Sequence, residues 1–311
     1  MSSIYSLSTS WHGASALSPE ELITRTTAMG FDRIELGFHL SMEMADAYVA
    51  AAQRGVLRIS SVHNVCPVPP GFTPGTFFPD HFSLASCVQE ERLRAVELAS
   101  GTLRLAQRAG ARVMVLHAGR VEIPERMHKL RAFADAGNRR SDEYERILVE
   151  MRRERESAKQ PHMNALKMSL EALVPLAERL DVIIGLETRY YFRELPNTEE
   201  FAELFAYFKG TAHVKYWHDM GHALVMEYLG LSGPGDFLER FAGLLCGIHF
   251  HDVRGSQDHR LPGQGSIDFS RFKPYLRPEI IRVLEVHPPV SDQELAQARQ
   301  FLEQIEPHPA G

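Results

Sequence analysis

Six short apolar runs in this chain each end on a side chain that can bind a metal ion. They are Ile59–His63, Val113–His117, Val182–Glu187, Val214–Asp219, Gly247–His249 and Ile280–Glu285. Short Val/Ile-rich runs separated by helical stretches are typical of buried parallel strands. When such strands close into a barrel, their carboxyl ends meet at one rim and distant residues surround one point. One such residue is more often structural, but the whole set favours a metal site.

Two earlier runs, Ile4–Ser10 and Arg33–Leu36, bring the number of expected strands to eight. Helix start and stop signals separate the strands; Ser18 followed by Pro19, for example, predicts an N-cap and a first helical turn. A chain of 311 residues fits one (β/α)8 barrel or two smaller domains, and no internal repeat or interdomain linker is visible. We therefore predict an α/β fold, a single TIM-barrel domain over residues 1–311.

Two segments depart from a minimal barrel. A helical insertion of about 120–160 follows the fourth strand, and its stretch 141–156 is acidic at its start and more basic later, which suits a helix dipole. We expect a solvated helix beside the rim there, with an oligomer contact as the alternative. The Pro/Gly-rich segment 66–79 follows the third strand and contains three aromatic residues. It is either a covering loop or a substrate lid at the catalytic rim.

Composition excludes some classes of protein. The formal charge of −6 argues against a broad nucleic-acid footprint, although a local basic patch is compatible with it. Three cysteines without paired spacing argue against a disulfide framework and favour a reducing cytoplasm. The N-terminus lacks the pattern of a signal peptide, and no apolar stretch is long enough to span a bilayer. We expect a cytoplasmic protein with no membrane partner.

Four of the strand-end residues come from strands five to eight, which are neighbours in a barrel: Glu187, Asp219, His249 and Glu285. Three carboxylates and one imidazole form a hard, mostly oxygen site for a divalent ion such as Mn, Mg, Co or Zn. Four protein ligands leave one or two positions open for substrate oxygens or water. The sequence therefore predicts one divalent metal held by these four residues.

Further polar residues follow the same strand ends. His222 stands three residues after Asp219 at the start of a helix, where it is either a ligand or substrate contact or a surface residue beside a helix cap. His251 has strand spacing from His249 and would lie further out, orienting a ligand or touching substrate. Arg260 is either a binding group for a substrate oxyanion or phosphate, or an ordinary surface charge.

Several motifs together resemble the xylose-isomerase-like TIM-barrel superfamily. They are Phe31-Asp-Arg-Ile-Glu-Leu-Gly37, the strand-five Glu187, Trp217-His-Asp-Met-Gly-His-Ala223, Ile248-His-Phe-His-Asp-Val-Arg254, Leu261-Pro-Gly-Gln-Gly-Ser-Ile-Asp268 and Val283-Leu-Glu-Val-His287. The resemblance covers most of the chain except about 120–160. This superfamily includes sugar isomerases and epimerases, inosose dehydratases, hydroxypyruvate isomerase and the endonuclease IV branch.

The resemblance implies that Glu187, Asp219, His249 and Glu285 are the metal ligands. In its ketose epimerase members the two glutamates also move protons at the substrate carbon. An arginine just before the Pro-Gly turn contacts substrate in those members, and Arg260 matches it.

The endonuclease IV branch uses more histidines to hold several zinc ions. His63 and His117 match its third-strand and fourth-strand ligands, and His222 matches another. Its final Asp-Arg-His pattern is one residue out of register here, since the chain reads Asp258-His259-Arg260. The basic, aromatic-rich loops that would grip a bent duplex are not visible.

The leading hypothesis is a metal-dependent isomerase or epimerase of a small sugar, sugar phosphate or related polyol-carbonyl compound. A metal on adjacent carbonyl and hydroxyl oxygens would stabilise an enediolate, while Glu187 and Glu285 remove and return the proton. His63 and His117 would then contact substrate or support the residues that do. The alternatives are a multi-metal phosphodiesterase, in which these histidines hold a second ion, and a non-catalytic barrel. We expect no nucleic-acid partner, and a homo-oligomer is compatible with the sequence.

Overall fold

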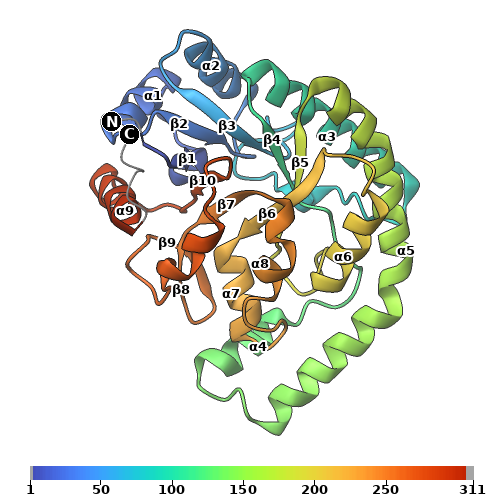
Figure 1. Ribbon diagram of the computed structural model, residues 1–311. Helices are drawn as coiled ribbons and strands as arrows, with labels where there is room; N and C mark the ends of the chain where they lie inside the picture. The colour runs from blue at the N-terminus through green and yellow to red at the C-terminus, as the bar shows by residue number, and fades with distance from the viewer. Residues whose placement is uncertain (1–2, 306–311) are drawn as a thin grey trace.

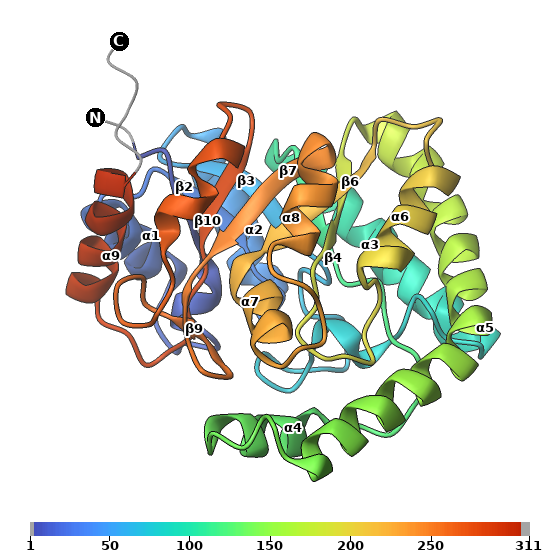
Figure 2. The ribbon, with the colours of Figure 1, turned by 60° about the horizontal axis from the view of Figure 1, so that its bottom comes forward.

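Eight parallel strands close into a barrel in the computed structural model, which describes residues 3–305 (Figures 1 and 2). Around the barrel the strands follow the order β1-β10-β7-β6-β5-β4-β3-β2. Their bounds are β1 Ser6–Ser8, β2 Arg33–Leu36, β3 Arg58–His63, β4 Val113–Leu116, β5 Ile183–Glu187, β6 Val214–Asp219, β7 Leu245–Phe250 and β10 Ile281–Leu284. A short antiparallel pair, β8 Asp252–Arg254 and β9 Gln257–Arg260, follows β7. The structure confirms the predicted TIM barrel.

Helices surround the barrel and connect most successive strands, whereas the β8–β9 pair and a 3-10 turn lie between β7 and β10 (Figure 1). The α-helices are α1 Pro19–Ala28, α2 Met42–Gln53, α3 Gln89–Ala109, α4 Met127–Asp135, α5 Asp142–Leu180, α6 Thr198–Tyr207, α7 Met220–Tyr228, α8 Asp236–Phe241 and α9 Asp292–Ile305. The short 3-10 turns within residues 3–305 are η1 Thr9–His12, η2 Pro79–His81, η3 Ala242–Leu244 and η4 Phe269–Tyr275. Ser18 forms a capping box with Glu21 at the start of α1, as its sequence position indicated.

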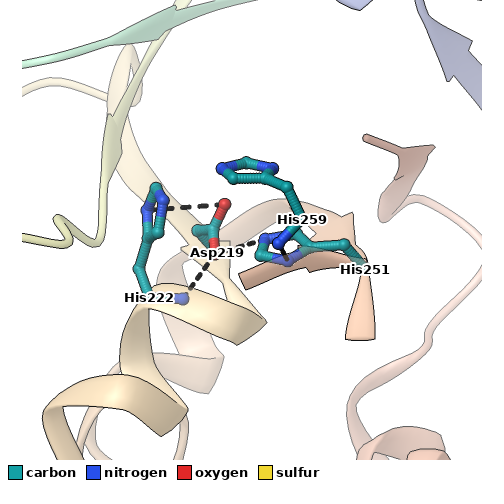
Figure 3. Close-up of side chains that lie close together, drawn as sticks. All are labelled: Asp219, His222, His251 and His259. Atoms are coloured by element: carbon teal, nitrogen blue, oxygen red, sulfur yellow. Dashed lines mark hydrogen bonds and ion pairs between the residues drawn. The ribbon is translucent and has the colours of Figure 1, made fainter. Parts of the chain in front are cut away.

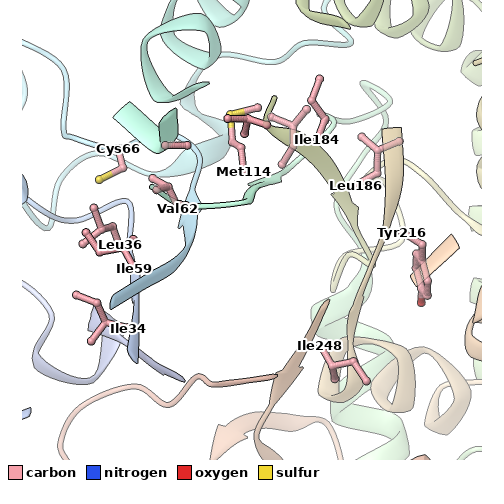
Figure 4. Packing of buried hydrophobic residues seen from close by; sticks show 14 of the residues in the cluster. Ile34, Leu36, Ile59, Val62, Cys66, Met114, Ile184, Leu186, Tyr216 and Ile248 are labelled. Atoms are coloured by element: carbon pink, nitrogen blue, oxygen red, sulfur yellow. The ribbon is translucent and has the colours of Figure 1, made fainter. Parts of the chain in front are cut away.

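Alternate residues of the strands belong to two different cores. Met114, Ile184 and Leu186 face the surrounding helices and belong to the large outer core (Figure 4), which also contains Leu116. The residues between them point into the barrel, where the inner core contains Val113, Val115, Trp217, Cys246 and Val283. This alternation is the period of two that a β-strand imposes. It also places the side chains at the strand ends on the inner side of the barrel.

Trp217 fills the barrel interior just below the site. Its ring fits because residue 247 is glycine: a Cβ atom added there would lie 2.1 Å from the Trp217 ring. The indole contacts the His249 ring with a centroid separation of 5.0 Å. The inner core therefore supports the polar residues of the rim from beneath.

The insertion after β4 consists of α4 and the first half of α5, which reach out from one end of the barrel (Figures 1 and 2). A separate hydrophobic core joins them to the rim, where Met127 and Tyr144 of the insertion pack with Val225 and Val253. The sequence placed the end of the insertion near residue 160, but α5 runs without interruption for 39 residues through Pro161. Proline removes one helical hydrogen bond, and packing of α5 along α3 offsets that loss.

Cys66, Cys87 and Cys246 are all free thiols, as the sequence predicted. Among residues 3–305, no helix combines the length and apolar character needed to cross a membrane.

Candidate functional site

The four residues predicted to bind a metal converge at the carboxyl ends of β5, β6, β7 and β10. Glu187, Asp219, His249 and Glu285 are buried, and each offers a ligand atom within 4.8 Å of the others. Nδ1 of His249 lies 2.8 Å from Oε1 of Glu187 and 3.1 Å from Oε2 of Glu285. Oδ2 of Asp219 lies 3.6 Å from the same nitrogen. The arrangement surrounds one point with three carboxylates and one imidazole nitrogen.

The electrostatics of this group favour a bound cation. Burial raises the pKa of Glu285 to about 8, against the opposing effect of His249, and the carboxylates of Glu35 and Glu187 add to this rise. The buried oxygen Oδ2 of Asp219 accepts no hydrogen bond within the described residues. A divalent ion would neutralise the crowded carboxylates and use this oxygen, and its preference for oxygen ligands matches the donor set. The residues therefore fit a divalent metal.

Glu35 of β2 holds the His249 ring from the opposite side. Nε2 of His249 lies 3.0 Å from Oε1 of Glu35, and the Ser61 hydroxyl donates to Oε2 of Glu35 at 2.8 Å. A carboxylate that accepts the second ring N–H fixes the tautomer and orientation of a metal-binding histidine. Sequence reasoning missed Glu35, although its position near the end of a strand placed it on the inner face.

We predict that Glu35→Ala weakens divalent-metal affinity roughly 10–100-fold, the usual cost of losing such a supporting carboxylate. Glu35→Gln keeps an acceptor oxygen for the ring N–H, so we expect a smaller loss. Competition with a fluorescent chelator measures both affinities. Equal affinity of Glu35→Ala and wild type would show that Glu35 does not position His249.

A second group extends outward from Asp219 (Figure 3). It contains Asp219, His222, His251 and His259, whose ligand-type atoms also lie within 4.8 Å of one another. The backbone N–H of His259 donates to Nδ1 of His251 at 2.8 Å, so Nε2 of His251 carries the proton and donates to Asp219 at 2.9 Å. His251 therefore orients the Asp219 carboxylate and has no free lone pair for a metal in this arrangement.

A third group lies on the other side of Glu187. His63, His117 and Glu187 offer ligand-type atoms within 4.8 Å of one another, and Arg189 lies among them. Burial alone would raise the pKa of Glu187, but the Arg189 guanidinium and the neighbouring histidines hold this pKa well below its usual range. Burial, with the His117 ring beside it, lowers the pKa of His63 to about 4. His63 is thus neutral near pH 7, while Glu187 is ionised.

A cavity of about 360 Å³ opens above these groups, a size suited to a small organic ligand. Glu187, Glu285, His63, His117 and His222 all line it. Its outer wall includes Arg131 of α4 and Asp80 of the segment between β3 and α3. The insertion and the loop after β3 therefore both border the site, as their positions in the sequence indicated.

The family model for the xylose isomerase-like TIM barrel matches residues 23–306, nearly the whole chain. The chain belongs to this family. No curated protein sequence matches it significantly.

Solved structures of other proteins share the fold of this chain at low sequence identity. A D-tagatose 3-epimerase-like protein is 18% identical, with a TM-score of 0.66 and coverage of 97% of this chain and 96% of the other. An L-ribulose 3-epimerase is 16% identical, with a TM-score of 0.68 and coverage of 98% and 94%. A D-allulose 3-epimerase from Methylomonas sp., solved in complex with D-allulose, is 14% identical, with a TM-score of 0.66 and coverage of 96% of each chain.

Two residues that the sequence predicted as substrate contacts, His251 and Arg260, do not line the cavity. His251 is fully buried and engaged with Asp219, and it does not line the cavity. Arg260 stands on β9, where its guanidinium donates to Gln257 at 3.3 Å, and it does not line the cavity either. The neighbouring His259 lines the cavity instead. Its backbone has a positive φ of 50°, which turns β9 at this residue.

Asp252 has a structural role beside the site. Its carboxylate accepts hydrogen bonds from the backbone N–H groups of Val253, Gly263, Gly265 and Ile267, at 2.8, 2.9, 2.8 and 3.1 Å. Residue 265 must be glycine, because a Cβ atom there would lie 2.1 Å from Oδ1 of Asp252. Asp252 therefore holds the Pro-Gly turn in place and does not face the cavity.

We predict that Asp252→Ala lowers the free energy of unfolding by about 3 kcal/mol, since four backbone N–H groups, one of them buried, lose a charged acceptor. Asp268→Ala in the same segment is a matched control. It removes only an exposed cap of η4, whose loss costs about 1 kcal/mol. Urea denaturation of both variants measures the difference. Equal stability of the two variants would contradict the anchoring role of Asp252.

Proposed function

We propose that this xylose isomerase-like barrel is a divalent-metal-dependent isomerase or epimerase. Its substrate class is a small sugar, a sugar phosphate or a related polyol-carbonyl compound. The observation that supports this most strongly is the pair Glu187 and Glu285. Both carboxylates line one cavity and both reach the same nitrogen of His249, at 2.8 and 3.1 Å. Two carboxylates at one polar cavity suit proton removal and return at a single carbon.

A divalent ion such as Mn, Mg, Co or Zn, held by Glu187, Asp219, His249 and Glu285, would acidify a C–H bond next to a carbonyl group. Glu187 is ionised in this environment, which is the state that a proton acceptor needs. Burial raises the pKa of Glu285 to about 8, so without an ion this carboxyl group is mostly protonated near pH 7. His63, His117 and His222 line the same cavity, and His63 and His222 are suited to orient substrate hydroxyl groups.

Structural neighbours support a sugar as the substrate. The similar solved structures include an L-ribulose 3-epimerase and a D-allulose 3-epimerase with D-allulose bound. The cavity of about 360 Å³ is lined by carboxylates, histidines and tyrosines, which can bind hydroxyl groups.

The free thiols of Cys66 and Cys246, both buried, support a reducing compartment such as the cytoplasm.

Solvent hydrogen exchange tests this function directly. The purified protein, loaded with Mn²⁺, is incubated in D₂O with a panel of ketoses, ketose phosphates and aldoses. We expect deuterium at the carbon next to the carbonyl of one substrate class, together with a new epimer or isomer, seen by NMR. Deuterium in no substrate, with the metal bound, would contradict the proposal. Cleavage of abasic-site DNA that is lost in Glu187→Gln would replace it with a phosphodiesterase.

A further inference from the structure

In the group of His63, His117 and Glu187, both histidines are oriented by hydrogen bonds of the kind found in metal sites. Nδ1 of His63 donates to the carbonyl of Asn64 at 2.9 Å, which leaves Nε2 with a free lone pair 3.9 Å from Glu187. Nδ1 of His117 bonds Asp80 at 2.9 Å, and Nε2 of His117 lies 2.9 Å from Oε2 of Glu187. Histidines that bind metals usually engage their other ring nitrogen with a carbonyl or a carboxylate in this way.

Arg189 fills the space between these ligand-type atoms. Its Nη1 lies 2.5 Å from Nε2 of His117 and 2.6 Å from Oε2 of Glu187. At these distances Nη1 donates to Oε2 of Glu187 and fills the space beside Nε2 of His117, the two atoms that an ion would have to contact. A bound ion and Nη1 cannot occupy this position together, since both would contact the same two atoms.

The Arg189 side chain is held in this position from its other end. Its Nη2 lies 3.2 Å from Oε1 of Glu194 and 3.5 Å from Oδ2 of Asp80, and the side chain is only 7% exposed. Oε2 of Glu194 in turn accepts the backbone N–H of Tyr191 at 2.9 Å. Three carboxylates, those of Asp80, Glu187 and Glu194, therefore compensate the buried guanidinium. Separating a buried charge from its partners costs much free energy, so the side chain is held in this position.

We propose that Arg189 occupies the place that a second metal ion would take between His63, His117 and Glu187. On this side of Glu187 the protein is thereby limited to the single ion held by Glu187, Asp219, His249 and Glu285. Two-metal hydrolysis needs two ions about 4 Å apart that share a bridging ligand. With Arg189 in place, Glu187 cannot be that bridge. The inference rests on the proposed function and deepens it, because it leaves the single ion that proton transfer needs and excludes a two-ion centre bridged by Glu187.

Replacing the arginine tests this directly. Wild type, Arg189→Met and Arg189→Lys are loaded with Zn²⁺ alone, dialysed, and analysed for metal per chain by mass spectrometry. We expect Arg189→Met to bind one more ion than wild type, whereas Arg189→Lys, which keeps the charge, binds no more. Arg193→Met is the matched control on the same loop, since Arg193 contacts Glu125 outside the site. It is expected to match wild type.

The position of the gained ion is tested by a second substitution. Adding His63→Ala to Arg189→Met is expected to remove the extra ion, whereas His63→Ala in the wild-type chain leaves metal content unchanged. An unchanged metal content in Arg189→Met, or a gained ion that survives His63→Ala, would overturn the inference.

The metal content of His63→Ala and the exchange of sugar hydrogen test the role of Arg189 and the proposed function separately. If Arg189→Met fails to fold, the single variant His63→Ala still decides, because a loss of metal in it would show that wild type already holds an ion there. A chain with the expected metal counts that exchanges no sugar hydrogen would contradict the proposed function and leave the role of Arg189 intact.

Discussion

Asp219→Ala is expected to remove most of the divalent metal from the purified protein. Asp219 is fully buried, its Oδ2 faces the shared position, and His251 holds its carboxylate in place. A supporting residue costs roughly 10–100-fold in affinity when it is lost, and a direct ligand should cost more than that. Metal content after dialysis and the affinity by chelator competition measure the effect. Activity is expected to fall with metal content.

The control for this prediction is Asp46→Ala. Asp46 lies at the surface on α2, where it pairs with Arg108 at 2.7 Å, and it does not line the cavity. We expect its metal content and stability to stay close to those of wild type, because exposed ion pairs contribute little. Full metal content and unchanged activity in Asp219→Ala would show that the site is assigned to the wrong residues.

The barrel and the central group could be predicted from the sequence because one physical rule links them. Parallel strands with a period of two place every second side chain on the inner face, and closure brings the strand ends together. The sequence runs that end at Glu187, Asp219 and His249 satisfied both conditions. Their convergence within 4.8 Å therefore needed no information about loops.

Other features depended on contacts that no local pattern reveals. Arg189 stands two residues beyond its strand, and its direction is set by Glu194 and by Asp80, which is distant in sequence. The first strand is shorter than the predicted Ile4–Ser10, because the chain turns into η1 after Ser8. Arg260 matched a family position, but the path of β9 brings His259 to the cavity instead. In each case tertiary packing fixed what local sequence left open.

The largest effect on turnover is expected for Glu187→Gln and Glu285→Gln. Glutamine preserves the size and one oxygen of the side chain but cannot accept a proton near neutral pH. Loss of a positioned acid or base typically lowers turnover by roughly 10²–10⁴-fold. Because both residues are also predicted metal ligands, the metal content of each variant must be measured before its rate is interpreted.

Hydrogen exchange can then separate the roles of the two glutamates. If Glu187 and Glu285 serve opposite faces of the substrate carbon, each variant loses one face and keeps the other. Glu187→Gln would still exchange solvent hydrogen into one epimer and Glu285→Gln into the other, although neither variant would interconvert them. If both variants retain metal and one of them still interconverts the epimers at the wild-type rate, that residue does not transfer the proton. The remaining glutamate would then have to serve both faces of the carbon.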